Sequence, residues 1–261
     1  MNFQSTTIAA FIAILTFPCA GMAGPEATER WTPLPPRVTP GEARTAPSDA
    51  LILFDGKDLA EWHASADPKS AAGWLVADGV LTVRKGAGNI QTRRLFTDYQ
   101  LHLEWRVPAG LAGQGQQRGN SGLFLASTGR GDLGYELQIL ACGDNPTYAN
   151  GQAGSIYKQH APMANACAAS GSWQSYDVVW RAPRFHADGS LAAPAHLTAF
   201  HNGVLIHDHV PLSGTTVYDG APSYRAHGAA AIKLQDHGDP VNFRNIWVRP
   251  IGADPALKAG N

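Results

Sequence analysis

A nine-residue segment, 99–107, alternates strictly between apolar and polar side chains, and no other feature of the sequence constrains the fold as strongly. One face of this segment carries Tyr99, Leu101, Leu103, Trp105 and Val107, and the other carries Gln100, His102, Glu104 and Arg106. Successive side chains of a β-strand point to opposite sides of its sheet, so the segment predicts a strand with one buried and one polar face. The same alternation recurs at 135–139 and 232–237.

Many further short strands are expected along the chain. They fall at 50–54, 74–76, 80–84, 121–126, 134–140, 153–157, 175–181, 195–201, 204–210, 229–235 and 241–249. Turn dipeptides separate several of them, most clearly Asn202-Gly203, which predicts a hairpin. No amphipathic helix of three turns or more is evident. This pattern predicts an all-β sandwich or barrel and excludes a βαβ fold.

The composition of the 261-residue chain fits one β domain and argues against a nucleic-acid binder. Charged residues make up 16% of the chain and the formal net charge is −1. Nucleic acids and anionic membranes select basic surfaces, so neither is the expected partner. The 28 glycines and 18 prolines suit many short strands joined by tight turns.

The N-terminal segment predicts export. An apolar run at 8–17 is too short to span a bilayer, and Gly21-Met22-Ala23 offers a cleavage site of small residues. We therefore expect a signal peptide at 1–23, a Pro-rich extended leader at 24–48, the folded domain at 49–252 and a tail at 253–261. The mature protein would have no membrane anchor and would be secreted or periplasmic.

Two cysteines remain once Cys19 leaves with the signal peptide. Cys142 and Cys167 form an even pair, which in an oxidising compartment predicts one disulfide. This disulfide would close a loop of about 25 residues and would stabilise the folded protein by roughly 3 kcal/mol. The alternative is a pair of buried free thiols. No metal-binding spacing such as CxxC is present.

The polar faces of the three alternating segments carry long hydrogen-bonding side chains. Gln138, Gln235, Arg106 and Glu136 suggest directed hydrogen bonding, whereas a merely solvated face is the simpler reading of each residue alone. Carboxylates and amides bind vicinal hydroxyls, and aromatic rings pack on the C–H faces of sugars. Candidate aromatic platforms are Trp62, Trp74, Trp173, Tyr157 and Tyr224. The combination points to a carbohydrate ligand.

Seven motifs in order resemble the 3-keto-disaccharide hydrolase domain family, which has a concanavalin-like jelly-roll fold. The matching stretches are 53–59 with Trp62, 103–106, 120–123, 135–140, 151–157, 172–177 and 233–238 running into 243–246. The resemblance covers about residue 50 to residue 251 and implies a jelly-roll sandwich of two antiparallel sheets. Many relatives carry an Asp after the Tyr-Glu-Leu-Gln segment, where this chain has Ala141-Cys142. Either Asp144 replaces it from a shifted position or its role is absent here.

The resemblance implies action on a glycoside whose C3 hydroxyl has been oxidised to a ketone. The ketone acidifies the C2 proton, so a base can abstract it, the C1 substituent can leave by elimination, and water can add back. Such a site needs a base near C2 and a donor for the enolate oxygen. Glu136 or His237 is the expected base, and Arg106, Lys233 or Arg244 the expected enolate stabiliser. Further substrate-binding candidates are Asn120, Gln138, Tyr157 and Gln235.

Two other functions stay open at this stage. Glu104 and Glu136 would form the carboxylate pair of an ordinary glycosidase if their strands were neighbours, although Gln138 stands where a second carboxylate would be wanted. A non-catalytic lectin-like module is the alternative outside catalysis, since this fold hosts both activities. No cofactor is expected. A structural calcium is compatible with the architecture, but no Asp-rich run requires it.

Overall fold

The computed structural model of the protein describes residues 24–42 and 45–252. The predicted signal peptide (1–23) and tail (253–261) lie outside the described residues. The chain divides into two units, Met1–Arg37 and Val38–Asn261. In the first unit the structure describes a short exposed 3₁₀ helix, η1 (Pro25–Ala27). No helix within 24–42 and 45–252 has the length and apolar character needed to cross a membrane.

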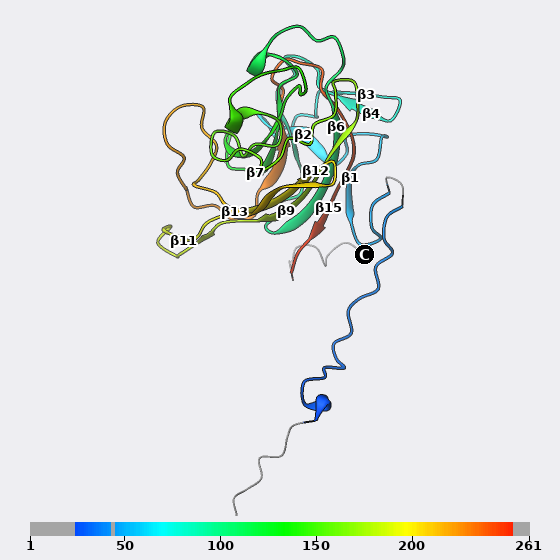
Figure 1. Ribbon diagram of the computed structural model, residues 1–261, viewed down its shortest axis with the longest axis vertical. Coiled ribbons are helices and arrows are strands. Elements are labelled where there is room, and N and C mark those ends of the chain that lie inside the picture. Colours follow the sequence, from blue (N-terminus) through cyan, green and yellow to red (C-terminus); the bar gives the residue numbers. More distant parts are fainter. Residues whose placement is uncertain (1–23, 43–44, 253–261) are drawn as a thin grey trace, which may run out of the picture. The chain divides into compact units, whose positions relative to one another are not determined.

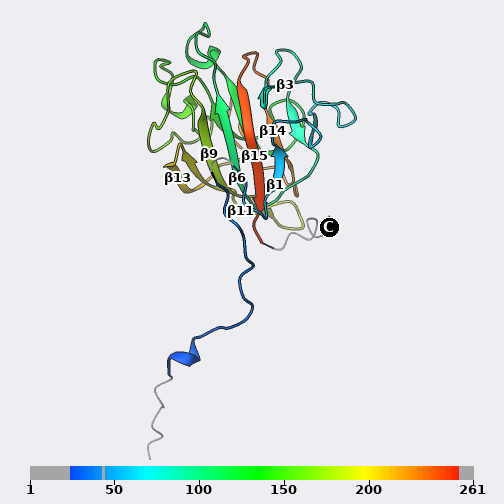
Figure 2. The same ribbon diagram turned by 90° about the vertical axis from the view of Figure 1, so that its right-hand side faces the viewer.

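Within residues 45–252 the chain folds into two main antiparallel sheets, which we call sheet A and sheet B (Figure 1). Sheet A has the spatial order β13 (Val204–Pro211), β12 (His196–His201), β9 (Gln174–Arg181), β6 (Tyr99–Arg106), β15 (Asn242–Pro250), β4 (Val80–Thr82) and β3 (Leu75–Ala77), and β1 (Leu51–Phe54) also pairs with β15. Figure 2 shows β9, β6, β15 and β1 side by side. Sheet B has the order β2 (Trp62–Ala64), β5 (Ile90–Thr92), β14 (Ala231–Leu234), β7 (Ser121–Ser127) and β8 (Gly134–Ile139). A separate hairpin joins β10 (Arg184–Phe185) to β11 (Leu191–Ala193).

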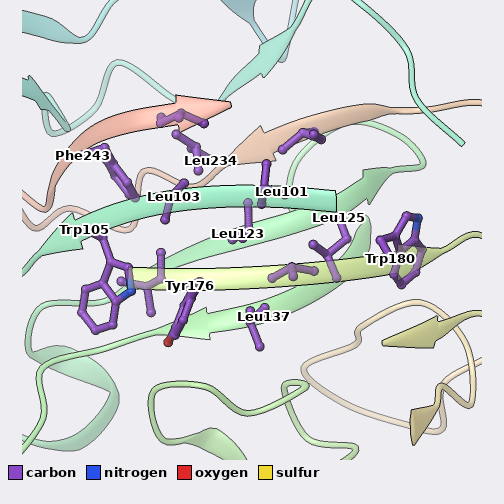
Figure 3. Packing of buried hydrophobic residues seen from close by; sticks show 14 of the residues in the cluster. Leu101, Leu103, Trp105, Leu123, Leu125, Leu137, Tyr176, Trp180, Leu234 and Phe243 are labelled. Atoms are coloured by element: carbon purple, nitrogen blue, oxygen red, sulfur yellow. The ribbon is translucent and has the colours of Figure 1, made fainter. Parts of the chain in front are cut away.

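The inward faces of the two sheets share one hydrophobic core (Figure 3). Sheet A contributes Leu101, Leu103, Trp105, Tyr176, Trp180 and Phe243, and sheet B contributes Leu123, Leu125, Leu137 and Leu234. Leu101, Leu103, Trp105, Leu137 and Leu234 come from the apolar positions of the alternating segments, and the others come from further strands, in which every second side chain likewise points inward. The prediction of an all-β sandwich with antiparallel sheets is therefore confirmed.

Most expected strands are present, and the exceptions have local causes. The segment 153–157 forms no strand and makes only isolated bridges at Ile156. Gly154 within it has φ +82°, a left-handed conformation that interrupts an extended backbone. Strands β2, β5, β10 and β11 were not expected, because two or three residues are too few to show a period of two.

The predicted disulfide is present. Cys142 and Cys167 are bonded, with a Cα–Cα distance of 5.9 Å. Both cysteines lie in the connection between β8 of sheet B and β9 of sheet A, so the bond ties the start of this connection to its end. The alternative of two free thiols is wrong.

Candidate active site

The outward face of sheet B carries the candidate site. In β8, Tyr135, Leu137 and Ile139 enter the core, so Glu136 and Gln138 point to the other side of the sheet. Both side chains are nevertheless buried, with 6% and 1% exposure. An outward-facing polar residue normally meets solvent, so loops must cover this face of the sheet.

Two of the loops beside this face are tied together by one carboxylate. Residues 107–120 precede β7, and residues 235–241 follow β14. Asp239 Oδ2 accepts hydrogen bonds from the backbone N–H groups of Gly119 at 2.6 Å and Asn120 at 3.3 Å. Asp236 Oδ1 accepts another from Gly238 N–H at 3.0 Å, which holds the turn around His237.

A cavity of about 250 Å³ lies against this face. It is lined by Gln116, Asn120, Asp132, Glu136, Tyr157, Thr216, Tyr218, Gln235 and His237. The structure thus brings together five of the residues proposed from the sequence. They are Asn120, Glu136, Tyr157, Gln235 and His237.

Glu136 has the most unusual environment in the cavity. Burial, with a smaller contribution from the charge of Asp132, raises the pKa of its carboxyl group to about 8. The carboxylate also lies so close to Gly122 that a Cβ atom there would stand 2.5 Å from Glu136 Oε1. The glycine of the Asn-Ser-Gly motif therefore provides the space that Glu136 occupies.

A chain of side-chain amides leads to this carboxyl group. Gln116 Nε2 donates to the carbonyl oxygen of Gly151 at 2.7 Å, which fixes the orientation of the Gln116 side chain. Gln138 Nε2 donates to Gln116 Oε1 at 2.8 Å. The other end of the Gln138 amide lies 3.1 Å from Glu136 Oε1. The position of Glu136 is thereby set by two amides that are themselves anchored.

Gln235 presents an unused acceptor to the same cavity. Its backbone is fixed by the N–H donation to Gly122 O at 3.1 Å and by Ser121 Oγ, which donates to Gln235 O at 2.7 Å. Its Oε1 is buried and has no hydrogen-bond partner among the described residues. Buried polar atoms without a partner are rare in proteins and are typical of a site that awaits a ligand donor such as a hydroxyl group.

Lys233 lies on the same face of sheet B but does not line the cavity. Its side chain is fully buried, and Nζ donates to the carbonyl oxygens of Gly129 at 3.1 Å, Gly131 at 2.7 Å and Leu133 at 3.0 Å. An ammonium group has three donors, so all of them are used. The expected role of Lys233 in stabilising an enolate is therefore corrected: it orders the turn that carries Asp132.

Glu104 lies on the outward face of the opposite sheet. Its strand β6 pairs with β9 and β15, not with β8. The Glu104 carboxylate accepts from Arg244 Nε at 2.5 Å and Asn245 Nδ2 at 2.9 Å. The two outward faces are separated by the shared core, so Glu104 and Glu136 cannot form the carboxylate pair of an ordinary glycosidase. That expectation is wrong.

The two arginine candidates also lie on sheet A. The guanidinium of Arg106 donates twice to Asn242 Oδ1, at 3.0 and 2.8 Å, and lies 4.6 Å from the Trp173 ring centroid. Arg244 lies 4.0 Å from the same ring. Both arginines belong to a network that covers sheet A, and neither contacts the cavity. Among the described residues no lysine or arginine lines it.

Four lining residues were not proposed from the sequence. Gln116 lies in the one-turn 3₁₀ helix η2 (Gly115–Gln117), Asp132 lies in a turn beside Gly131, and Thr216 and Tyr218 lie in a long loop between β13 and β14. Such segments have no period that predicts side-chain direction. Asp144, the candidate replacement for the family's Asp, accepts from Arg118 Nη2 at 2.5 Å and lies outside the lining.

Among the described residues, no group of three or more His, Cys, Asp or Glu side chains is arranged to hold a metal ion. The carboxylates of Asp132 and Glu136 line one cavity.

Comparison with known proteins assigns the chain to a family. The sequence profile described as the 3-keto-alpha-glucoside-1,2-lyase-like domain matches residues 49–249. The chain belongs to this family. The resemblance found in the seven motifs is thereby confirmed, and the match runs through both sheets, the cavity and the sheet A network.

Individual members of the family show the same relationship. A 3-keto-disaccharide hydrolase of Bacteroides thetaiotaomicron is 22% identical over 238 residues, which cover 77% of this chain and 78% of that protein. A solved Parabacteroides distasonis structure, assigned provisionally to the glycosyl hydrolases, is 47% identical with a TM-score of 0.82, covering 89% of this chain and 98% of that one. A second solved structure from that organism shares the fold, with a TM-score of 0.56 and 20% identity. The alignment covers 78% of this chain and 94% of that one.

Proposed function

We propose that the protein cleaves 3-keto-glycosides by proton abstraction, elimination and hydration. A base takes the proton from C2, and the electron pair of that C–H bond forms an enolate with the C3 ketone. The C1–O bond then breaks, the leaving alcohol takes up a proton, and a C1–C2 double bond remains. Water adds its oxygen to C1 while a proton returns to C2, so the net reaction is hydrolysis. The family membership and the cavity with its two carboxyl groups support this chemistry.

Glu136 is the base in this proposal, and its burial is the observation that carries it. A carboxylate with an ordinary pKa is a weak base toward a carbon acid, whereas the pKa of Glu136 is about 8. General bases work best when their pKa lies near the working pH. The burial that raises the pKa of Glu136 therefore makes it the proposed base.

His237 and neutral donors complete the proposed site. His237 lines the cavity with Glu136 and is the proposed donor to the leaving oxygen. The enolate oxygen would be stabilised by neutral N–H or O–H groups, because no cation lines the cavity within the described residues. Thr216 is one such donor: its Oγ1 accepts from Glu136 N–H at 3.0 Å, which leaves its own O–H available. Gln235 Oε1 would accept from a substrate hydroxyl.

Deuterium exchange tests the mechanism. The protein is incubated with a 3-keto-glucoside in deuterated water, and products are followed by NMR and mass spectrometry. Deuterium at C2 of the released keto-sugar is expected for the wild-type protein and is expected to be lost with Glu136→Gln. Cleavage without exchange at C2 would point to direct displacement and would overturn the proposed base.

A carbohydrate-binding module without catalysis is the second candidate, favoured by the exposed aromatic side chains beside the cavity. Such a module would bind the 3-keto-glycoside without turnover, and Glu136→Gln would alter its affinity only slightly. An unchanged substrate after long incubation, with measurable binding, would support this alternative.

We also propose that the protein acts after export. The Cys142–Cys167 disulfide supports this, since such bonds persist in oxidising compartments. N-terminal sequencing of the protein recovered from outside the cytoplasm is expected to start near residue 24. An intact N-terminus in a cytoplasmic fraction would contradict the proposal.

A further inference from the structure

The enolate of the proposed reaction needs hydrogen-bond donors for its oxygen at C3. The three cations suggested by the sequence, Arg106, Lys233 and Arg244, do not line the cavity. Thr216 is one neutral donor there, and an oxyanion is usually held by more than one group. C3 is bonded directly to C2, whose proton goes to Glu136. A second donor must therefore reach the cavity close beside Glu136.

A short backbone pairing next to β8 places Tyr157 beside Glu136. Leu137 and Ile156 form an antiparallel bridge, and both of their side chains enter the core. The residues next to them are also joined, because the backbone N–H of Tyr157 donates to Glu136 O at 3.2 Å. Successive side chains alternate in direction, so Glu136 and Tyr157 both turn away from the core, and both line the cavity. Side chains that oppose each other in an antiparallel pair are close neighbours.

Tyr157 is the buried phenol of this cavity. It is 9% exposed, whereas Tyr218, the other tyrosine in the lining, is 79% exposed. A hydrogen bond to a developing charge is stronger where water is excluded. Burial, aided by the hydrogen bond with Tyr148, raises the pKa of the Tyr157 hydroxyl. Tyr157 therefore keeps its proton over the neutral range and acts as a hydrogen-bond donor.

Tyr148 is placed to direct that hydroxyl into the cavity. The hydroxyl oxygens of Tyr148 and Tyr157 lie 2.6 Å apart, and either can donate to the other. Tyr148 is 40% exposed, so its oxygen can accept from water while its single O–H donates to Tyr157. In that arrangement the O–H of Tyr157 stays free for a ligand. The bond that Tyr157 accepts also polarises its O–H and makes it a better donor.

We propose that Tyr157 is a catalytic residue whose hydroxyl donates to the enolate oxygen, and that Tyr148 is its positioning residue. This inference rests on the proposed function. As Glu136 takes the C2 proton, the electron pair of the C–H bond forms a C2–C3 double bond, and the π pair of the C3 carbonyl moves onto its oxygen. The O–H of Tyr157 stabilises that oxygen and retains its own proton. When the carbonyl forms again, Tyr157 is unchanged.

Enolisation without cleavage tests the role of Tyr157. The probe is 1,5-anhydro-3-keto-glucitol, which has the C3 ketone but no leaving group at C1, so exchange of its C2 proton in deuterated water reports the enolate alone. Tyr157→Phe keeps the ring and is expected to slow this exchange about 100- to 1,000-fold, as measured by NMR. Tyr224→Phe is the matched control, because its hydroxyl bonds only to the backbone of Ala195 and Leu212. It should leave exchange within about twofold of wild type.

A second substitution at the same position keeps the hydroxyl group. Replacement of Tyr157 by 3-fluorotyrosine preserves the shape of the ring and makes the phenol more acidic, which strengthens it as a donor. Exchange at C2 is expected to stay within about threefold of wild type or to become faster. A loss as large as that in Tyr157→Phe would show that the hydroxyl is not the donor.

A double-mutant cycle tests the role of Tyr148. If Tyr148 acts through the Tyr157 hydroxyl, Tyr148→Phe should slow C2 exchange about tenfold in the wild-type protein and by less than about twofold in Tyr157→Phe. A general structural effect of Tyr148 would slow exchange equally in both backgrounds. Equal losses would therefore overturn the positioning role.

The outcomes separate this inference from the proposed function. Wild-type exchange that is lost in Glu136→Gln but stays within about threefold in Tyr157→Phe would overturn the role of Tyr157 and leave the proposed function standing. Absence of C2 exchange in the wild-type protein would mean that no enolate forms, and both proposals would be wrong.

Discussion

One end of the Gln138 side-chain amide lies 3.1 Å from Oε1 of Glu136, while its Nε2 donates to Gln116 at 2.8 Å. An amide has an N–H donor side and a carbonyl acceptor side of nearly equal shape. With Nε2 on Gln116, the Gln138 carbonyl oxygen faces Glu136 and accepts from its protonated carboxylic acid. The rotated amide instead donates to the Glu136 carboxylate at 3.1 Å and to Ser121 O at 3.0 Å, and gives up its bond to Gln116. Gln138 thus has an acceptor orientation for the acid and a donor orientation for the carboxylate.

Replacing Gln138 with Glu is expected to shift the pH dependence of catalysis upward. Two carboxyl groups at this separation disfavour each other's ionisation, which raises the pKa of Glu136 beyond its value of about 8. Since a base acts in its deprotonated form, the rising limb of kcat/KM should move to higher pH. Gln138→Leu is the uncharged control and is expected to lower kcat/KM by roughly 10- to 100-fold without the charge-driven shift. Superimposable pH profiles for the wild type and Gln138→Glu would refute this role.

Glu136 should also make the stability of the protein depend on pH. Its pKa is about 8 in the folded protein against 4.5 as the reference value, so between these values the folded state retains a proton that the unfolded chain has lost. Stability therefore falls as the pH rises through this window, and the cost stays constant above it. The Glu136→Gln side chain cannot titrate, so the Tm of this variant is expected to rise relative to that of the wild type as the pH rises. The corresponding difference in the free energy of unfolding is a few kcal/mol, at about 1.4 kcal/mol per pKa unit.

Thermal unfolding between about pH 5 and about pH 8.5 measures this effect. Glu42→Gln, at an exposed position, is the matched control and should show a constant difference from wild type. A difference between Glu136→Gln and wild type that does not change with pH would mean that Glu136 titrates normally.

Glu104→Gln is expected to lower the stability of the protein without lowering its activity, because Glu104 lies on the outward face of sheet A and the cavity lies on that of sheet B. The carboxylate is 7% exposed and holds both Arg244 and Asn245 on sheet A, so removal of its charge weakens a largely buried ion pair. We expect a loss of about 1–3 kcal/mol in the free energy of unfolding. Turnover of a 3-keto-glycoside should stay within about twofold of wild type, because the core separates Glu104 from the cavity. A large loss of kcat with unchanged stability would return Glu104 to the active site.

The fold followed from the sequence because its strands are long enough to show their period. The segment 99–107 predicted which residues enter the core, and the structure buries Leu101, Leu103 and Trp105 as expected. Short strands such as β2 and β5 gave no such signal, because three residues do not establish an alternation. Their burial depends on neighbours that are distant in the sequence.

The site was only partly predictable from the sequence. An alternating pattern predicts that a side chain faces away from the core, but it does not predict to which of the two sheets its strand belongs. Glu104 and Glu136 show the same pattern and lie on opposite faces of the sandwich. Lys233 shows the pattern too, yet its ammonium group turns to three carbonyl oxygens of a neighbouring turn. Asp132 and Tyr218 come from loops, where side-chain direction is set by long-range contacts.

Lys233→Met tests whether this lysine is a structural element of the site. Methionine is of similar length but cannot donate to the carbonyl oxygens of residues 129, 131 and 133. Each hydrogen bond from a charged donor contributes about 1.5–3 kcal/mol. Part of this loss is recovered when water binds the freed carbonyl oxygens. We expect the free energy of unfolding to fall by about 2–4 kcal/mol in chemical denaturation. The turn that carries Asp132 should also show faster amide hydrogen exchange, since its order depends on these bonds. Lys85→Met, at an exposed position, is the control. If Lys233→Met were as stable as Lys85→Met while losing turnover, Lys233 would have a direct role in the chemistry after all.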